Sequence, residues 1–403
     1  MSGPLWAWRR PPARRWGGGG GGRAAPPPPP HALRREGFTG TLTMVGDELR
    51  LPYDRPPLSK QILAGEWEPH KATLRPEQDV QRLELDMKLG CRATGADSVA
   101  RTVTLDNGER LDYDGLIIAT GLRPRRLPFG HDLAGVYVLR TLDDALTLRA
   151  QLLAGPRVVV IGAGFLGSEI AATARGLGLD VTLVDVEPTP LARQVGSEIG
   201  QLVAETHREH RVSLHMRRHV TSMTGENGRV TAVVLDDGTR LPADVVVVAI
   251  GSVPATDWLA DSGIPLGDGV LCDPTCRAVS GVYAAGDVAN WPHPLAGGRI
   301  RLEQRTNATQ QAIIAARNLL AGPNRALPYA PIPFGWTDQY DTKIQIHGWC
   351  PSDAPIEVVD GDPRSRRFVA LYHADGKVVG ALGWNSPRAL LQHRNRLTEH
   401  ATA

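Results

Sequence analysis

Residues 157–185 carry the feature that most restricts the fold: a strand, a glycine-rich turn, a helix and a second strand, in that order. Three glycines with G-x-G-x-x-G spacing, Gly162, Gly164 and Gly167, join the first strand to the helix. Such glycines permit a tight turn, a close approach of the backbone to a pyrophosphate, and close packing of the helix on the strand. The helix N-terminus then faces the negative charge of the phosphates. The pattern predicts a dinucleotide-binding unit.

Asp185 ends the second strand of this unit, 18 residues after Gly167. This is near the spacing of about 20 residues that is usual for the acid that binds a ribose in such units. A carboxylate accepts hydrogen bonds from a ribose 2′-hydroxyl and repels a 2′-phosphate, so Asp185 favours NAD over NADP. Arg193 follows closely enough in sequence to keep the phosphorylated form open. Glu169, one turn into the helix, is either a solvated side chain or a group lining the nicotinamide pocket.

Composition bounds the class of protein. A chain of 403 residues predicts two or three domains. Its 45 basic and 43 acidic residues give a net charge of +2, so we expect no general attraction to nucleic acid or membrane. No apolar run approaches the roughly 20 residues of a membrane helix, and no secretory signal is recognisable. The four cysteines are scattered without zinc spacing, which predicts no metal site and a cytoplasmic location.

Residues 1–31 differ in composition from the rest of the chain. Six glycines at 17–22 fix no backbone conformation, and five prolines at 26–30 favour polyproline II. We therefore expect residues 1–31 to be disordered. From residue 32 the chain reads as an α/β protein.

Several strings carry a resemblance to a known family. The most specific is residues 52–60, PYDRPPLSK, and three further strings at 139–144, 301–303 and 336–341 support it. With them, residues 32–395 resemble the NADH-dependent ferredoxin reductases of the pyridine nucleotide–disulfide oxidoreductase superfamily, which serve oxygenases and cytochromes P450. The resemblance implies FAD and NAD as cofactors.

The resemblance also implies an α/β fold with two Rossmann-like nucleotide-binding domains and a C-terminal α+β domain. The FAD-binding domain would be discontinuous, formed by residues 32–122 and 250–325. The NAD-binding domain would be inserted at 123–249, and the C-terminal reductase domain would cover 326–403.

Site residues are implied by the same likeness. Asp47 would hold the adenosine ribose of FAD, Arg55 and Lys60 would lie beside the pyrophosphate and flavin, and Asp287 would bond the ribityl chain. Lys60 and Glu169 are the candidate catalytic residues. Lys60 would place a positive charge near flavin N5, which stabilises the reduced ring, and Glu169 would line the nicotinamide pocket. The alternatives are an exposed lysine for Lys60 and a simple cap for Asp287. The further expected cofactor contacts are Arg140, Glu303, Arg305 and Trp336.

Three of these further contacts have competing interpretations. Arg140 either contacts FAD or forms a salt bridge at a helix start. Arg305 stands where related reductases have an aromatic or apolar residue, and it either alters the flavin potential or points outward. Trp336, like Trp384, suits a flavin-side wall, although a buried core position is commoner for tryptophan.

Residues 56–60 contain no cysteine pair, whereas the disulfide reductases of the superfamily have one in this region. Electrons therefore leave the flavin directly, and the predicted acceptor is a [2Fe–2S] ferredoxin. Arg123, Arg125 and Arg126 are candidates for docking it. Two alternatives remain: an NADH oxidase or quinone-type reductase, and a flavin-free remnant that binds NAD only.

The family begins with a strand and a glycine loop for FAD, and no such pair is recognisable before residue 32. The first strand and the phosphate loop are therefore expected to be missing. We interpret the N-terminus as a misread or frameshifted coding region; tryptic peptides from residues 16–34 of the native protein would contradict this.

Overall fold

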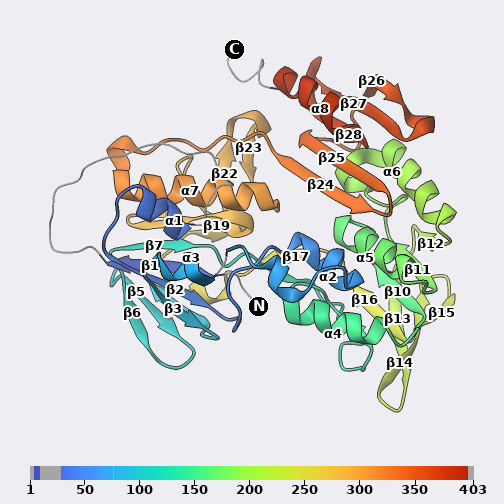
Figure 1. Cartoon of the computed structure of the whole chain (residues 1–403), viewed down its shortest axis with the longest axis horizontal. Helices are drawn as coiled ribbons and strands as arrows, with labels where there is room; N and C mark the ends of the chain where they lie inside the picture. The colour runs from blue at the N-terminus through green and yellow to red at the C-terminus, as the bar shows by residue number, and fades with distance from the viewer. Residues whose placement is uncertain (1–3, 10–28, 76, 398–403) are drawn as a thin grey trace. The chain divides into compact units, whose positions relative to one another are not determined.

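The computed structural model describes residues 4–9, 29–75 and 77–397. The chain divides into two units, each built from three segments (Figure 1). The first unit comprises Met1–Tyr53, Thr73–Arg123 and Val253–Pro331, and the second comprises Asp54–Ala72, Pro124–Ser252 and Ile332–Ala403. Among the described residues, no helix has both the length and the apolar character needed to cross a bilayer.

The first unit is built on a six-stranded sheet, and it also contains a three-stranded sheet within residues 93–112 and a four-stranded sheet within residues 266–300. Its six-stranded sheet has the order β20-β21-β7-β1-β2-β3, and α7 packs against β7 and β21 while α1 packs against α7 (Figure 1). Its elements are β1 (Leu5–Arg9), α1 (Pro29–Arg35), β2 (Thr41–Gly46), α3 (Glu77–Gln81), β3 (Leu85–Leu89), β4 (Ala93–Asp97), β5 (Thr102–Leu105), β6 (Arg110–Asp112), β7 (Gly115–Ile118), η3 (Asp257–Leu259), β18 (Leu266–Gly267), β19 (Gly269–Leu271), β20 (Arg277–Val279), β21 (Val282–Ala284), η4 (Gly286–Val288), β22 (Ala289–His293), η5 (Pro294–Ala296), β23 (Gly298–Ile300), α7 (Arg305–Ala321) and η6 (Pro323–Arg325). The short strands β8 (Leu122–Pro124) and β17 (Ser252–Pro254) carry the chain between the units.

The second unit contains two five-stranded sheets and a small three-stranded sheet formed within residues 220–242. A five-stranded sheet of order β12-β11-β10-β16-β9 is parallel throughout, and the C-terminal sheet of order β24-β25-β28-β27-β26 is antiparallel. The elements are η1 (Pro56–Ser59), α2 (Gln61–Ala64), η2 (Pro69–Ala72), β9 (Val136–Tyr137), α4 (Leu142–Leu152), β10 (Val158–Ile161), α5 (Phe165–Gly176), β11 (Val181–Asp185), α6 (Ala192–Glu209), β12 (Ser213–Met216), β13 (Val220–Glu226), β14 (Arg229–Leu235), β15 (Arg240–Pro242), β16 (Val245–Val248), β24 (Phe334–Gln339), β25 (Thr342–Gly348), β26 (Ile356–Asp362), η7 (Pro363–Ser365), β27 (Arg367–Ala374), β28 (Lys377–Trp384), α8 (Pro387–His393) and η8 (Arg394–Leu397).

Helix α6 joins the parallel sheet of the second unit to the C-terminal sheet. Its apolar residues Leu191, Val195, Ile199 and Val203 share one buried cluster with residues of β25, β27 and β28. The Tyr372 hydroxyl also donates to the Val195 carbonyl over 2.7 Å. Helix α6 thereby helps to hold the parallel sheet and the C-terminal sheet together, and α5 also packs against β24 of the C-terminal sheet.

The expected α/β architecture is confirmed, and the elements predicted around the glycine turn lie where the sequence placed them. The division into an FAD-binding, an NAD-binding and a C-terminal domain stays a prediction. One difference from its boundaries is that residues 54–72 group with the second unit rather than with the FAD-binding part.

The N-terminus also differs from the sequence-based expectation of disorder. Residues 5–9 form β1, which lies between β2 and β7 and is antiparallel to both. The alternating bulky residues of Leu5–Arg9 fit a strand, but the glycines and prolines dominate the composition of residues 1–31 as a whole. A strand therefore stands at the position in the sheet that was expected to be empty, and it runs antiparallel to both of its neighbours. Residues 10–28, which include the glycine run and the prolines at 26–28, lie outside the described residues. The last two residues of the proline run, Pro29 and Pro30, begin α1.

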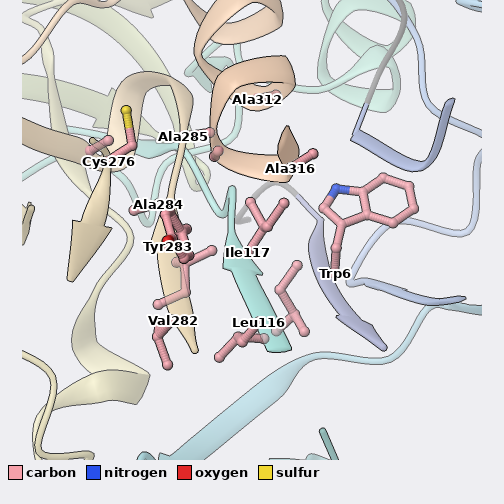
Figure 2. Close-up of a cluster of buried hydrophobic side chains, with 14 of the residues drawn as sticks. Trp6, Leu116, Ile117, Cys276, Val282, Tyr283, Ala284, Ala285, Ala312 and Ala316 are labelled. Carbon is pink, nitrogen blue, oxygen red and sulfur yellow. The ribbon is translucent and has the colours of Figure 1, made fainter. Parts of the chain in front are cut away.

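Trp6 makes β1 part of the core of the first unit. It is 5% exposed and belongs to the same buried cluster as Leu116 and Ile117 of β7 and Ala316 of α7 (Figure 2). Removing a buried indole forfeits both its transfer free energy and its packing contacts. We expect Trp6→Ala to lower the free energy of unfolding of the first unit by about 3–5 kcal/mol, measured by chemical denaturation. Val99→Ala, which removes an apolar side chain that is 92% exposed in the same unit, is the control and should change little.

Candidate functional site

The glycine loop of the second unit lies between β10 and α5. Gly162 has φ +103°, and a Cβ added there would lie 2.3 Å from the Ala249 carbonyl oxygen. A Cβ on Gly167 would lie 1.8 Å from the Gly162 carbonyl oxygen. Gly164, the N-cap of α5, meets only the Gln194 side chain at 3.7 Å. Gly162 and Gly167 are therefore required by the close packing of the loop, while Gly164 leaves its surface open for a ligand to approach.

Asp185 lies beside this loop at the carboxyl end of β11. Its carboxylate accepts hydrogen bonds from the amide of Ala163, inside the loop, and from the amide of Glu187 over 2.8 Å. The predicted ribose-binding acid and the phosphate-type loop are therefore at one edge of the parallel sheet. This donor and acceptor set fits an NAD-type dinucleotide.

A second polar cluster surrounds Glu169 on α5. Its Oε2 accepts from Lys60 Nζ over 2.7 Å and from Ser59 Oγ over 2.6 Å. Its Oε1 accepts from the Thr337 hydroxyl of β24 over 2.9 Å. The Thr173 hydroxyl of α5 donates to the Ser59 carbonyl over 2.7 Å, which fixes the segment that carries Lys60. Three stretches distant in sequence thus meet at one carboxylate.

Lys60 and Glu169 are nearly buried, so the loss of either partner would be costly for stability. The Lys60 and Glu169 side chains are 11% and 7% exposed. A buried ammonium or carboxylate is costly unless paired and hydrogen-bonded, and here each satisfies the other. The interpretations of an exposed Lys60 and of a solvated Glu169 are both wrong, because the two side chains pair inside the protein. Ser59 and Thr337 were not singled out in the sequence, although both lie within strings that carry the family resemblance.

The Arg55 side chain contacts the main chain of Arg140. Arg55 Nη1 donates to the Arg140 carbonyl over 2.6 Å. The Arg140 amide donates to the Asp144 carboxylate over 3.0 Å, next to the capping box that Thr141 and Asp144 form at the start of α4. Arg140 therefore takes part in the helix start through its main chain. Whether its side chain contacts FAD stays a prediction.

The first unit places two acidic residues at one edge of its sheet. Asp47 directly follows β2 and Asp287 follows β21 by two residues, and these strands run parallel. Between them β1 enters the sheet: Leu5 lies opposite Val45 of β2 and Ile118 of β7. A Cβ added to Gly46 would lie 4.0 Å from the Cβ of Pro4. Pro4 thus occupies the edge of the sheet between the two acids.

Arg301 connects two of the predicted residues in the first unit, Glu303 and Asp287. It pairs with Glu303 over 2.6 Å and with Asp268 over 3.1 Å, and Nη1 donates to the Asp287 carbonyl over 3.1 Å. Its side chain is 12% exposed. Arg305 is the first residue of α7. Arg301 was quoted only as part of a family string, yet it is the group that positions Glu303 beside Asp287.

The two candidate tryptophans differ in burial. Trp384 is fully buried and stacks with Phe368 in the core of the C-terminal sheet, with ring centroids 5.9 Å apart. Trp336 is half-buried on β24 and stacks with Phe334 at a centroid distance of 5.9 Å. Trp384 is therefore a core residue, and Trp336 alone keeps the predicted role as a flavin-side wall.

All four cysteines are free. Burial raises the pKa of Cys272 to about 12 and raises the pKa of the Cys276 and Cys350 thiols further. The thiolate is the form that reacts in thiol–disulfide exchange, so these three thiols cannot act as a redox relay at neutral pH. Cys91 is half-buried and has no cysteine beside it in sequence.

The described residues fit FAD in part. In the first unit, Asp47 and Asp287 suit the hydroxyl-bearing ribose and ribityl groups. The other two expected FAD contacts, Arg55 and Lys60, belong to the second unit, and their part in binding FAD stays a prediction. The edge between the two acids holds Pro4, which has no amide hydrogen to offer a pyrophosphate. In the second unit, by contrast, all three glycines of the loop are present and Asp185 lies beside them.

Comparison with known proteins gives matches over nearly the whole chain. The model described as pyridine nucleotide-disulphide oxidoreductase matches residues 17–312, and the model described as reductase C-terminal matches 334–403. A ferredoxin–NAD(P)+ reductase of Sphingomonas sp is 37% identical over 372 residues, covering 91% of this chain and 89% of that protein. The ferredoxin–NAD+ reductase component of the biphenyl dioxygenase system of Paraburkholderia xenovorans is 36% identical, covering 89% of this chain and 86% of that protein.

Two solved structures agree with these matches. The ferredoxin reductase of the CYP199A2 system from Rhodopseudomonas palustris superimposes with a TM-score of 0.86 at 35% identity, over 91% of this chain and 90% of that chain. A covalent complex of putidaredoxin reductase with putidaredoxin gives a TM-score of 0.87 at 31% identity, over 92% and 90%.

Proposed function

The chain belongs to the pyridine nucleotide-disulphide oxidoreductase family, and we propose that it is an FAD-dependent oxidoreductase that passes electrons from NADH to a [2Fe–2S] ferredoxin serving an oxygenase or a cytochrome P450. The observation that carries the proposal is the pairing of a complete NAD-type loop with the buried cluster of Lys60 and Glu169 in one unit. FAD supplies the step from a hydride to single electrons.

Each predicted site residue has a role in binding NADH, in binding FAD or in stabilising developing charge. The loop amides and the N-terminus of α5 bind the pyrophosphate of NADH, and Asp185 accepts hydrogen bonds from the adenosine ribose. Glu169 holds Lys60 in one orientation, so that a fixed positive charge is available where negative charge develops. Asp47, Arg55, Asp287, Glu303 and Trp336 would contact FAD. Arg123 would be a poor ferredoxin contact by itself, because it pairs with Asp257.

The absence of a thiol relay separates this proposal from a disulfide reductase. Residues 56–60 hold no cysteine, and burial keeps three of the four thiols protonated. A protein acceptor must therefore take its electrons from the flavin itself. A cytoplasmic location stays part of the proposal, supported by the four free cysteines.

The test is electron transfer to cytochrome c, assayed with FAD and NADH present. We expect the rate to rise at least about tenfold when a [2Fe–2S] ferredoxin is added, because the ferredoxin provides the single-electron path. The oxidase or quinone-reductase alternative would be favoured if ferredoxin did not change the rate and if NADH oxidation were accompanied by equal consumption of oxygen or quinone. Heat-treated protein and a ferredoxin stripped of iron serve as controls.

A further inference from the structure

Beyond Asp185, a set of charged residues gathers at the edge where β11 and β12 end. The two strands are parallel, and Asp185 lies opposite Met216. The Arg217 amide donates to the Glu187 carbonyl and the Arg218 amide to the Asp185 carbonyl, each over 3.0 Å. Arg217 and Arg218 therefore follow β12 directly into the corner that Asp185 occupies.

The start of α6 brings a third arginine to the same corner. The Leu191 amide donates to the Ala163 carbonyl of the glycine loop over 2.9 Å. Gln194 lies 3.7 Å from the position of a Cβ on Gly164. Arg193 stands between these two contacts in sequence, and so it emerges next to the loop.

The three guanidinium groups are held differently. Arg193 Nε pairs with Glu187 Oε1 over 2.6 Å, and Arg218 Nε pairs with Asp237 over 2.9 Å. Arg217 is exposed and makes no ion pair with any residue in the described ranges. The Arg193 side chain is 72% exposed. Exposed ion pairs contribute little to folding stability, so removal of the Glu187 carboxylate should leave the fold intact.

We propose that Glu187 is a specificity residue for the adenosine ribose of the dinucleotide. Its carboxylate pairs with Arg193 over 2.6 Å and so holds this guanidinium away from a 2′-phosphate. Arginine is the residue that accommodates the 2′-phosphate of NADP in this type of fold, and arginine–phosphate pairs are among the stronger hydrogen bonds. Arg193 could thus bind a 2′-phosphate, but its guanidinium is already paired with Glu187. This inference rests on the proposed use of NADH.

The test measures binding of 5′-ADP and 2′,5′-ADP by calorimetry, since these fragments require neither flavin nor ferredoxin. We expect the natural chain to prefer 5′-ADP. Glu187→Gln should improve the affinity for 2′,5′-ADP relative to 5′-ADP by about tenfold, because Arg193 is released to the phosphate. The gain should disappear in Glu187→Gln/Arg193→Ala.

A matched control is Glu226→Gln, which makes the same charge change at an exposed site of β13. The proposal is overturned if Glu187→Gln gains no more than Glu226→Gln, if the gain survives in the double variant, or if the natural chain binds both fragments equally. Failure of the reductase function would look different: fragment binding would persist, and ferredoxin-dependent cytochrome c reduction would be absent.

Discussion

Glu169→Ala is expected to lower the free energy of unfolding of the second unit by about 3–5 kcal/mol. The substitution leaves the Lys60 ammonium, 11% exposed, without its carboxylate partner at 2.7 Å. It also removes the acceptor for Ser59 and Thr337. An uncompensated buried charge costs far more than the ion pair itself contributes. Chemical denaturation at neutral pH, followed by circular dichroism, measures the loss.

The same carboxylate should matter for the reaction. With Lys60 no longer held in one orientation, we expect anaerobic reduction of the flavin by NADH to slow by about 100-fold, a size typical of removing one preorganised electrostatic contact. Stopped-flow absorbance with FAD added in excess checks this. A slower reaction with unchanged NADH affinity would fit a role for the pair in the reaction rather than in binding.

The double variant Lys60→Met/Glu169→Leu separates stability from activity. It replaces both charges by apolar side chains of similar volume, which is often neutral for stability. We expect stability close to that of the natural chain, together with slow flavin reduction. Normal flavin reduction in this double variant would contradict a role for the pair in the reaction and leave it a structural one.

The pairing itself shows what the sequence could and could not predict. The glycine loop and Asp185 were predictable, because they depend on local spacing within one strand–helix–strand unit. Lys60 and Glu169 were candidates separately, but they are 109 residues apart, and Thr337 is 168 residues from Glu169. No local periodicity encodes such contacts, which arise only when α5, η1 and β24 pack together.

The strand β1 exposes a different limit of sequence reasoning. Residues 5–9, four of which have large side chains, stand close to long glycine and proline runs, so the average composition of residues 1–31 does not reveal them. Their direction is decided by the sheet, since β2 and β7 offer an open position whose backbone groups can pair with an antiparallel strand. Neither the place nor the direction of β1 could be predicted from residues 5–9 alone.

The reversed direction of β1 has a large expected effect on flavin retention. In a dinucleotide-binding unit, the first strand ends at the phosphate edge, where a glycine loop and a helix N-terminus follow. Here β1 begins at that edge, and Pro4 occupies it; Arg9, at the other end, lies opposite Thr41 at the start of β2. Helix α1 is seven residues long and begins with Pro29 and Pro30, which have no amide hydrogens.

We therefore expect FAD to be held weakly, so that the chain purifies with less than one flavin per molecule and takes up FAD when it is added. Losing two amide donors to a charged pyrophosphate costs about 3 kcal/mol, or about a hundredfold in Kd. The ratio of flavin to protein absorbance after desalting, followed by titration with FAD, measures both quantities.

The glycine loop at Gly162 provides the internal control, because binding of 5′-ADP at that loop shows that the second unit of the same preparation is folded. Asp287→Asn should weaken FAD binding further and leave 5′-ADP binding unchanged, since Asp287 belongs to the first unit. Stoichiometric flavin that survives desalting would contradict the prediction, and it would mean that donors other than those described bind the pyrophosphate. Weak flavin with intact 5′-ADP binding would instead place the defect at the edge occupied by Pro4, where β1 enters the sheet.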